Sequence, residues 1–305
     1  MRCGLVFFAA LSACACTAIA GAGGRPVVVA RSAVTALAAD GDQAAFAAAR
    51  TNADCDRVFV WQLRTHRTFQ LGKRQRCDTG STGRGVAGVA VTGGRALWVN
   101  YVGGNYREWR LWTATTARPT PRQLQFVARD VDDPQPLIVG KASGGLLPYA
   151  LDSTVTTLRA NGATAFAWPA SSPIIALAAR DGRVAVAQAG ARVTVLDDHG
   201  KTVSVDLYST EVSAIAFVPK GLLVQRGPVL ELRRGADMHE FAIAAGAKLE
   251  DANGKSVVWS ADGLVHVMSL PDGAETAVYP GTHAALAGNR LYVANGRRIT
   301  LRTIR

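Results

Sequence analysis

Short hydrophobic runs of about five to eight residues recur along the chain after its first 30 positions, separated by small and turn-forming residues. Many runs carry β-branched or aromatic residues, several alternate apolar with polar positions, and none keeps a helical period. Between them stand Gly and Asp pairs, such as "ADGD" at 39–42 and "RDGR" at 180–183, which suit the positive φ of tight hairpins. The pattern predicts an all-β chain of short antiparallel strands.

The runs form a four-part unit that repeats along the chain. Its third run is the easiest to align, and reads "VFVWQL", "EWRLWT", "VTTLRA", "VTVLDD", "VLELRR", "VHVMSL" and "ITLRTI". The equivalent positions are Trp61, Trp112, Leu158, Leu196, Leu232, Met268 and Arg302, at steps of 51, 46, 38, 36, 36 and 34 residues. Seven copies of four strands at this period indicate a seven-bladed β-propeller of four-stranded antiparallel blades.

The last blade lacks a fourth strand, because the chain ends on "ITLRTI". A matching run, "PVVVA" at Pro26–Ala30, precedes the first blade. We expect these two segments to pair and close the ring, since an open strand edge invites aggregation. The expected blades span 33–77, 85–129, 136–169, 173–208, 211–244, 247–280, and 283–305 together with 26–30.

In its period and strand pattern, the chain resembles the WD-repeat-like, quinoprotein-like and TolB-like superfamily of β-propellers. Trp61 and Trp112 stand where a WD repeat places its tryptophan, although Gln and Thr follow them. Only Leu196 is followed by an aspartate. The resemblance implies a fold, and a fold does not fix a function.

The N-terminus has the features of an export signal. Arg2, an apolar run from Leu5 and the small-residue site Ala18–Ala20 predict a secretory signal peptide over 1–20, followed by a single propeller domain over 21–305. Two alternatives remain open, an uncleaved anchor helix and a bacterial lipoprotein signal in which Cys14 of "LSAC" would be lipidated. All three place the domain outside the cell or in the bacterial cell envelope.

Cys55 and Cys77 are the cysteines of the mature chain, which is an even pair in an exported protein. Cys55 lies in a second-to-third-strand turn and Cys77 in a link between blades, so both fall at the same end of blade 1. We expect them to form a disulfide, worth about 3 kcal/mol in the chain-entropy model. A two-thiol metal site is the alternative, but only His66 lies between them and no Cys-x-x-Cys spacing occurs, so no metal is predicted.

The formal net charge is +11, mostly from arginine. This balance favours anionic lipid, cell-wall polymer or nucleic acid as a partner. A genome rich in G and C would produce the same arginine bias without any such partner.

The early blades have longer loops than the late ones, and these loops lie at one end of the ring around blades 1 and 2. Long loops on a rigid scaffold concentrate binding groups, and arginine mixed with aromatic residues suits anionic or sugar-like ligands. Ordinary solvated loops are the alternative. The predicted contact residues are Arg74, Arg76, Arg84, Tyr101, Asn105, Tyr106, Arg107 and Trp109.

Two loop motifs resemble ligand sites but lack the right context. Gly83–Gly88 spells G-x-G-x-x-G, yet it leads into a strand where a dinucleotide site would open a helix. Asp130, Asp132 and Asp133 offer carboxylates to Ca²⁺ without an ordered ligand spacing, so we expect an exposed acidic turn.

Three titratable residues fall on predicted innermost strands, near the central channel. They are His283, Glu250 and Asp251. We expect a partly buried structural role for the histidine, and no nucleophile motif accompanies the three.

The sequence therefore predicts a monomeric binding or scaffold module for a protein, a glycan or a polyanionic surface, with no cofactor and no specific nucleic acid. The alternative is a lactonase-like hydrolase or a lyase with its site at the channel mouth. That alternative requires several carboxylates or histidines to converge on the axis.

Overall fold

The computed structural model describes residues 25–49, 55–72, 83–270 and 272–304. These residues form 28 β-strands, and no helix occurs among them. No described segment is therefore a helix long enough to cross a membrane. The strands are β1 (Arg25–Val29), β2 (Val34–Asp40), β3 (Gln43–Ala49), β4 (Asp56–Gln62), β5 (Arg67–Gln70), β6 (Arg84–Thr92), β7 (Arg95–Gly103), β8 (Tyr106–Thr115), β9 (Arg122–Asp130), β10 (Leu137–Val139), β11 (Leu146–Leu151), β12 (Thr154–Arg159), β13 (Thr164–Pro169), β14 (Ile174–Arg180), β15 (Arg183–Gln188), β16 (Arg192–Asp197), β17 (Thr202–Leu207), β18 (Ala214–Val218), β19 (Gly221–Arg226), β20 (Val229–Arg234), β21 (Asp237–Ala242), β22 (Lys248–Ala252), β23 (Ser256–Ala261), β24 (Leu264–Ser269), β25 (Glu275–Pro280), β26 (His283–Ala287), β27 (Arg290–Asn295) and β28 (Arg298–Thr303).

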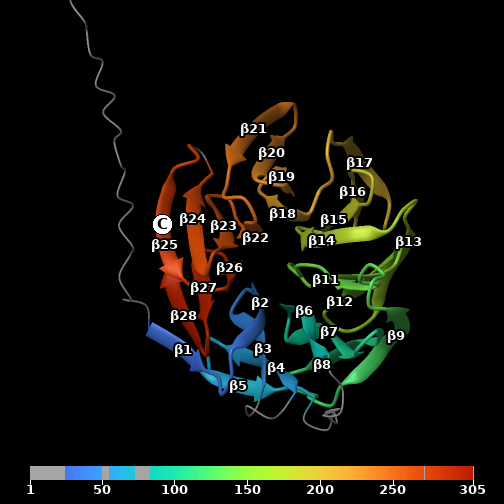
Figure 1. Ribbon diagram of the computed structural model, residues 1–305, viewed down its shortest axis with the longest axis vertical. Helices are drawn as coiled ribbons and strands as arrows, with labels where there is room; N and C mark the ends of the chain where they lie inside the picture. The colour runs from blue at the N-terminus through green and yellow to red at the C-terminus, as the bar shows by residue number, and fades with distance from the viewer. Residues whose placement is uncertain (1–24, 50–54, 73–82, 271, 305) are drawn as a thin grey trace, which may run out of the picture.

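The strands form seven four-stranded antiparallel sheets arranged in chain order around a central axis (Figure 1). Blade 1 is β2–β5, blade 2 is β6–β9, and each later blade takes the next four strands up to blade 6, β22–β25. The first strand of each blade is innermost. The fold is a seven-bladed β-propeller, which confirms the prediction from the repeat.

Blade 7 joins the two ends of the described chain. Its strand order is β1-β28-β27-β26, and β1 pairs antiparallel with β28, with Val28 opposite Ile299 and Val29 opposite Arg298. The backbone N–H of Ala30 also donates to the carbonyl of Arg297 at 2.8 Å. The expected closure of the ring by an N-terminal strand is confirmed.

The hydrophobic core is divided into clusters, most of which lie between neighbouring blades. Between blades 4 and 5, Ala178, Val193 and Ile215 belong to one such cluster. Small inner residues fit here because seven strands converge on the axis, while larger aliphatic residues fill the wider space further out. The tight hairpins use the predicted turn residues, and at the β14–β15 turn Asp181 and Gly182 have φ of 49° and 73°.

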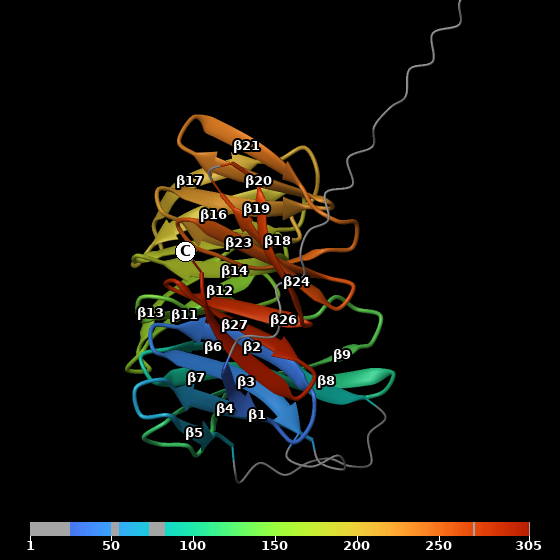
Figure 2. The same cartoon turned by 90° about the vertical axis from the view of Figure 1, so that its left-hand side faces the viewer.

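The alternating strand directions give the ring two distinct ends. We call the end with the second-to-third-strand turns and the links between blades the link end. The other, with the first-to-second-strand and third-to-fourth-strand turns, is the hairpin end. Figure 2 shows the ring from the side, with the strands of each blade running between the two ends.

An ion pair spans the axis from blade 3 to blade 6. Asp251 on β22 is only 3% exposed, and its carboxylate accepts hydrogen bonds from Lys141 Nζ and, at 2.7 Å, from the backbone N–H of Leu286 in blade 7. Lys141 follows β10, and its carbonyl accepts a hydrogen bond from the N–H of Ala179 in blade 4. The Asp251 carboxylate therefore connects blades 3, 6 and 7 across the channel.

Candidate functional site

Blade 2 has the longest strands of the propeller. β7, β8 and β9 contain 9, 10 and 9 residues, whereas the corresponding strands of blade 4, β15, β16 and β17, contain 6 each. The extra length lies partly at the link end, where the ends of β8 and β9 project (Figure 2). The β7–β8 turn is therefore held on a rigid sheet.

An arginine and two aromatic rings stack on this extension. Tyr101 on β7 pairs directly with Trp109 on β8, and their ring centroids lie 5.2 Å apart at an interplanar angle of 40°. The guanidinium carbon of Arg107 lies 5.1 Å from the Tyr101 ring centroid, within cation–π range. A Cβ at position 85 would lie 2.9 Å from the Tyr101 hydroxyl oxygen, so a residue larger than glycine there would displace the Tyr101 ring.

The predicted contact residues differ in how much surface they offer. Tyr106, at the start of β8, is 63% exposed, and Asn105 in the turn before it is also exposed. Trp109 is 7% exposed and packs with Leu111 and Leu137, so it supports the Tyr101 ring from below and offers little surface of its own. The prediction that Trp109 forms part of the contact surface is corrected in that respect.

The turn itself is fixed by the backbone. The carbonyl of Asn105 accepts the N–H of Val131 at 2.7 Å, which ties the turn to the link that follows β9. Gly103 has φ of 134°, and its N–H donates to the carbonyl of Gly83 at 2.8 Å. These bonds preorganise the exposed side chains.

Two polar atoms in this region are buried without a hydrogen-bond partner among the described residues. They are Asn100 Oδ1, on β7, and Arg107 Nε. Buried polar atoms are normally satisfied, so each marks a place where a bound group or water would be favoured. Both lie in the part of blade 2 that also carries the stack.

The remaining predicted residues are divided between described and undescribed parts of the chain. Arg84 starts β6 and pairs with Val102, one residue from Tyr101. Arg74, Arg76 and Cys77 lie outside the described residues. Cys55 takes part in a disulfide, and its pairing with Cys77 stays a prediction.

A second arginine–aromatic contact on the same blade was not predicted from the sequence. Arg110 on β8 places its guanidinium carbon 5.5 Å from the ring of Phe126 on β9, and it is also paired with Glu108. Phe126 is 49% exposed. The mixture of charged and aromatic residues along 106–110 could have indicated an exposed face, but the cross-strand register to Phe126 was needed to find the contact.

The loop motifs flagged in the sequence have structural roles. Gly83–Gly88 runs into β6, as expected. Asp130 Oδ1 accepts the N–H of Asp132 at 3.1 Å, which is the bond of an Asx turn.

The inner-strand residues are engaged with protein groups. Burial lowers the pKa of His283, while the nearby Glu250 carboxylate acts in the opposite direction. Glu250 accepts a hydrogen bond from the Ser260 hydroxyl at 2.7 Å, and Asp251 is held by Lys141 as described above.

Within the described ranges, one group of three residues has the spacing to hold a metal ion, Asp197, Asp198 and His199. It lies in the β16–β17 turn, away from the axis. Asp197 Oδ1 accepts the N–H groups of His199 and Lys201, both at 2.9 Å, and these bonds lower the pKa of its carboxyl group. These two hydrogen bonds give Asp197 a structural role in the turn.

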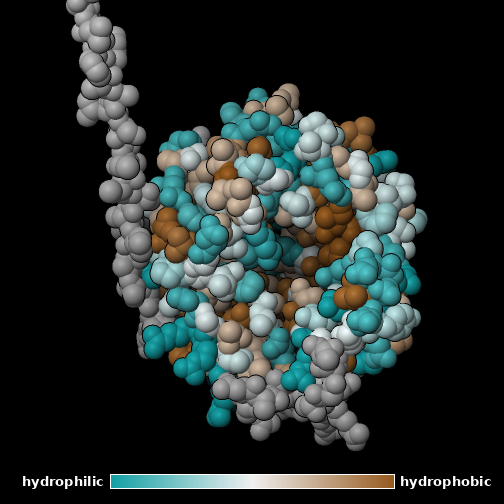
Figure 3. Space-filling view, viewed as in Figure 1, coloured by the Kyte–Doolittle hydropathy of each residue, from teal (hydrophilic) through white to brown (hydrophobic). Residues whose placement is uncertain are grey.

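The space-filling view shows a mostly hydrophilic face around the central opening, with an apolar patch beside it over β14 and β15 (Figure 3).

No protein-family model and no curated protein matches the sequence. Solved structures do resemble it. The WD40 propeller domain of Doa1 has a TM-score of 0.60 at 10% identity, covering 92% of this chain and 97% of that one. A chain of the mitotic checkpoint complex has a TM-score of 0.59 at 14% identity, covering 92% and 93%. BamB from Moraxella catarrhalis has a TM-score of 0.51 at 15% identity, covering 87% and 92%. At such identities the likeness concerns the fold alone, and the chain is a seven-bladed β-propeller that resembles WD40 domains and BamB.

Proposed function

We propose that the protein is an exported scaffold that binds a partner protein through the extension of blade 2. The observation that carries this proposal is the preorganised stack of Arg107 on Tyr101, beside the exposed Asn105–Tyr106 turn. Tyrosine and arginine are enriched at the energetic centres of protein interfaces, where they bring large contact area and several hydrogen-bond donors.

Three features support a protein partner. The turn is rigidly held, so that little ordering entropy opposes binding. Arg107 is held against the Tyr101 ring yet stays partly exposed, so its guanidinium can meet an acceptor of the partner. Propellers of this kind occur in multiprotein assemblies, as the mitotic checkpoint complex illustrates.

The proposal also includes export of the protein and a disulfide bond between Cys55 and Cys77. The sequence of residues 1–20 supports cleavage after a secretory signal, leaving a domain from residue 21, with lipidation at Cys14 as the alternative. A Cys55–Cys77 bond would tether the loops of blade 1 next to blade 2 in an oxidising compartment.

Site-specific photocrosslinking in the producing cells tests the proposal. A benzoylphenylalanine in place of Tyr106 should give a discrete crosslinked species, while the same residue in place of Met238, which is 56% exposed on blade 5, should not. The Tyr106 crosslink should weaken when Arg107→Gln is added. Absence of a discrete product at position 106, or equal products at both positions, would show that blade 2 is not the contact surface.

A polyanionic surface is the second candidate, favoured by the net charge of +11. It requires strong retention on a heparin column that weakens steeply with salt, because phosphate or sulfate contacts release counterions. Elution at low salt together with a discrete crosslink would decide for the protein partner.

A further inference from the structure

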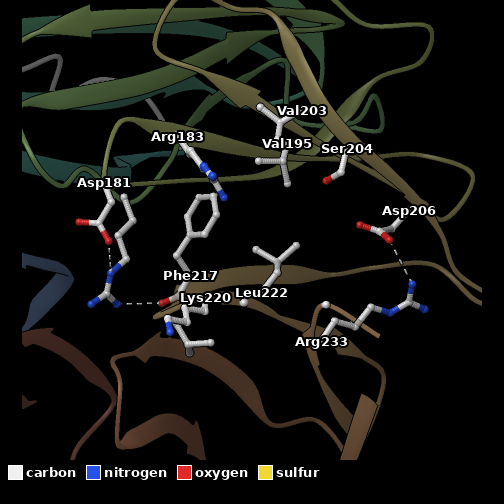
Figure 4. A pocket seen from close by; sticks show the side chains of 14 residues that line it. Asp181, Arg183, Val195, Val203, Ser204, Asp206, Phe217, Lys220, Leu222 and Arg233 are labelled. Carbon is white, nitrogen blue, oxygen red and sulfur yellow. Dashed lines mark hydrogen bonds and ion pairs between the residues drawn. The ribbon is translucent and has the colours of Figure 1, made fainter. Parts of the chain in front are cut away.

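A cavity of about 490 Å³ lies between blades 4 and 5, far from the blade 2 extension around the ring. It begins at the hairpin end, at the β14–β15 and β18–β19 turns, and continues between β17 and β20 (Figure 4). Its volume falls within the range of about 300–1,000 Å³ that is typical of sites for small molecules.

The middle of the cavity is apolar. Val195 and Leu222 contribute from the two facing blades, and both are otherwise almost fully buried in the protein. Phe217, on β18, adds an aromatic ring between them and the hairpin end (Figure 4). An apolar ligand group would therefore meet aliphatic and aromatic surface on both sides.

The two acidic residues of the lining are already neutralised. Asp181 pairs with Arg180 at 3.3 Å, and Asp206 pairs with Arg233 at 3.3 Å. Arg180 is fixed further by donating to the carbonyl of Phe217 at 3.2 Å. These contacts leave neither acid as the dominant charge of the cavity.

Two basic residues of the lining have no acidic partner among the described residues. Arg183, at the start of β15, and Lys220, in the β18–β19 turn, make no ion pair within the part of the chain that the structure describes. Both lie toward the hairpin end of the cavity, on the same side as Phe217 and Asp181 (Figure 4). The cavity thus has an excess of positive charge at one end and an apolar wall beyond it.

We propose that this cavity binds a small organic acid with one terminal carboxylate and an apolar aromatic or aliphatic body. The carboxylate lies at the hairpin end of the cavity, where Arg183 and Lys220 supply the positive charge, and the body lies against Phe217, Val195 and Leu222. A purely charged ligand and a purely apolar ligand both fit the cavity less well. A bare inorganic anion would leave the apolar wall unfilled, and a neutral hydrocarbon would leave the two cations without a counterion. The site lies elsewhere on the ring and does not depend on the proposed role of blade 2.

Titration of the ¹⁵N-labelled protein with 4-phenylbutyrate, followed by amide chemical shifts, tests the proposal. Saturable shifts are expected for residues of β14, β18 and the two hairpin turns. The neutral 4-phenylbutyramide has the same shape and should bind about five- to tenfold more weakly, because each exposed ion pair contributes modestly. The peptide acetyl-Gly-Gly-Phe, which carries the same terminal group, shows whether the acid is accepted as a free molecule or as a chain end.

The variants separate this site from general attraction to a basic protein. Arg183→Gln with Lys220→Gln should weaken binding of the acid about five- to tenfold and should not change binding of the amide. The matched control, Arg122→Gln with Lys201→Gln, removes the same charge from exposed positions outside the cavity and should bind as the unmodified protein does. Ser204→Trp, at an exposed strand position of the lining, should fill the cavity and abolish binding of both compounds.

Each result decides the matter in one direction. Preference for the acid, lost in the cavity variant and kept in the control, supports the proposal, and tighter binding of either the free acid or the peptide identifies the source of the ligand. Equal binding of acid and amide, equal loss in both double variants, or shifts that map away from blades 4 and 5 would overturn it.

Discussion

Replacing Lys141 by methionine tests whether the ion pair across the axis holds the ring together. The substitution keeps an unbranched side chain of similar length but removes the ammonium group that faces Asp251. The carboxylate of Asp251 would stay buried, with the N–H of Leu286 as its remaining partner from another blade. A buried charge without its counterion is strongly unfavourable.

The expected loss is about 3–5 kcal/mol of the free energy of unfolding, the usual cost of removing one partner of a buried ion pair. Because Lys141 keeps some contact with solvent, with its side chain 27% exposed, we expect the lower part of this range. The unfolding entropy of a domain of this size is about 0.6 kcal/mol/K, so a loss of about 3 kcal/mol lowers Tm by about 5 °C.

The same reasoning predicts non-additivity. Asp251→Asn removes the charge but keeps an oxygen that can accept the N–H of Leu286, so it should cost only about 1–2 kcal/mol. Adding Asp251→Asn to Lys141→Met should then raise the stability above that of Lys141→Met alone. Urea denaturation and thermal unfolding of the two single variants and the double variant complete the cycle. Two results would refute the argument. One is a loss of less than about 1 kcal/mol of unfolding free energy in Lys141→Met, and the other is a double variant that is less stable than Lys141→Met alone.

Two further predictions concern ring closure and pH. A chain starting at residue 31 lacks β1 and leaves the edge of β28 unpaired, so it should melt at a lower temperature and form oligomers that size-exclusion chromatography detects. A chain starting at residue 25 keeps β1 and should do neither. Equal behaviour of the two chains would mean that β1 does not close the ring. Burial lowers the pKa of His283 in the folded state below its unfolded value near 6.5, so the unfolded state binds more protons below that pH and stability falls on acidification through this range. Urea unfolding between pH 7.5 and 5 should show this loss in the native sequence and a flatter profile in His283→Gln, and parallel profiles would contradict the assignment.

The fold was accessible from the sequence because its determinants are local and repeated. Turn pairs such as Asp181–Gly182 mark many of the hairpins, and the missing fourth strand of the last blade left "PVVVA" as its partner. Because the four-strand unit repeats, the order of the strands in each blade could be predicted by assigning four successive runs to each blade.

The site was less accessible because its determinants are contacts between strands. The sequence placed Tyr101, Arg107 and Trp109 in one region, but Trp109 lies beneath Tyr101 and is buried, which depends on strand register and sheet face. The Lys141–Asp251 pair joins residues 110 positions apart in the chain, and no spacing rule within a repeat connects blade 3 with blade 6. The cavity between blades 4 and 5 depends on how far two sheets diverge, which the pattern of runs does not encode.

The geometry of the ring accounts for where these sites occur. Seven inner strands converge on the axis, so small residues such as Ala178 and Ala216 are favoured there, and the axis is crossed by an ion pair. The blades diverge outward, and the space between neighbours widens with distance from the axis. Binding capacity is therefore concentrated where a blade extends beyond its neighbours, as at Tyr106, or where two blades separate, as between Val195 and Leu222. A variant that disrupts the axial pair should destabilise the whole ring, whereas substitutions of exposed residues at these two outer places, such as Tyr106 and Arg183, should change binding and leave the unfolding transition unaltered.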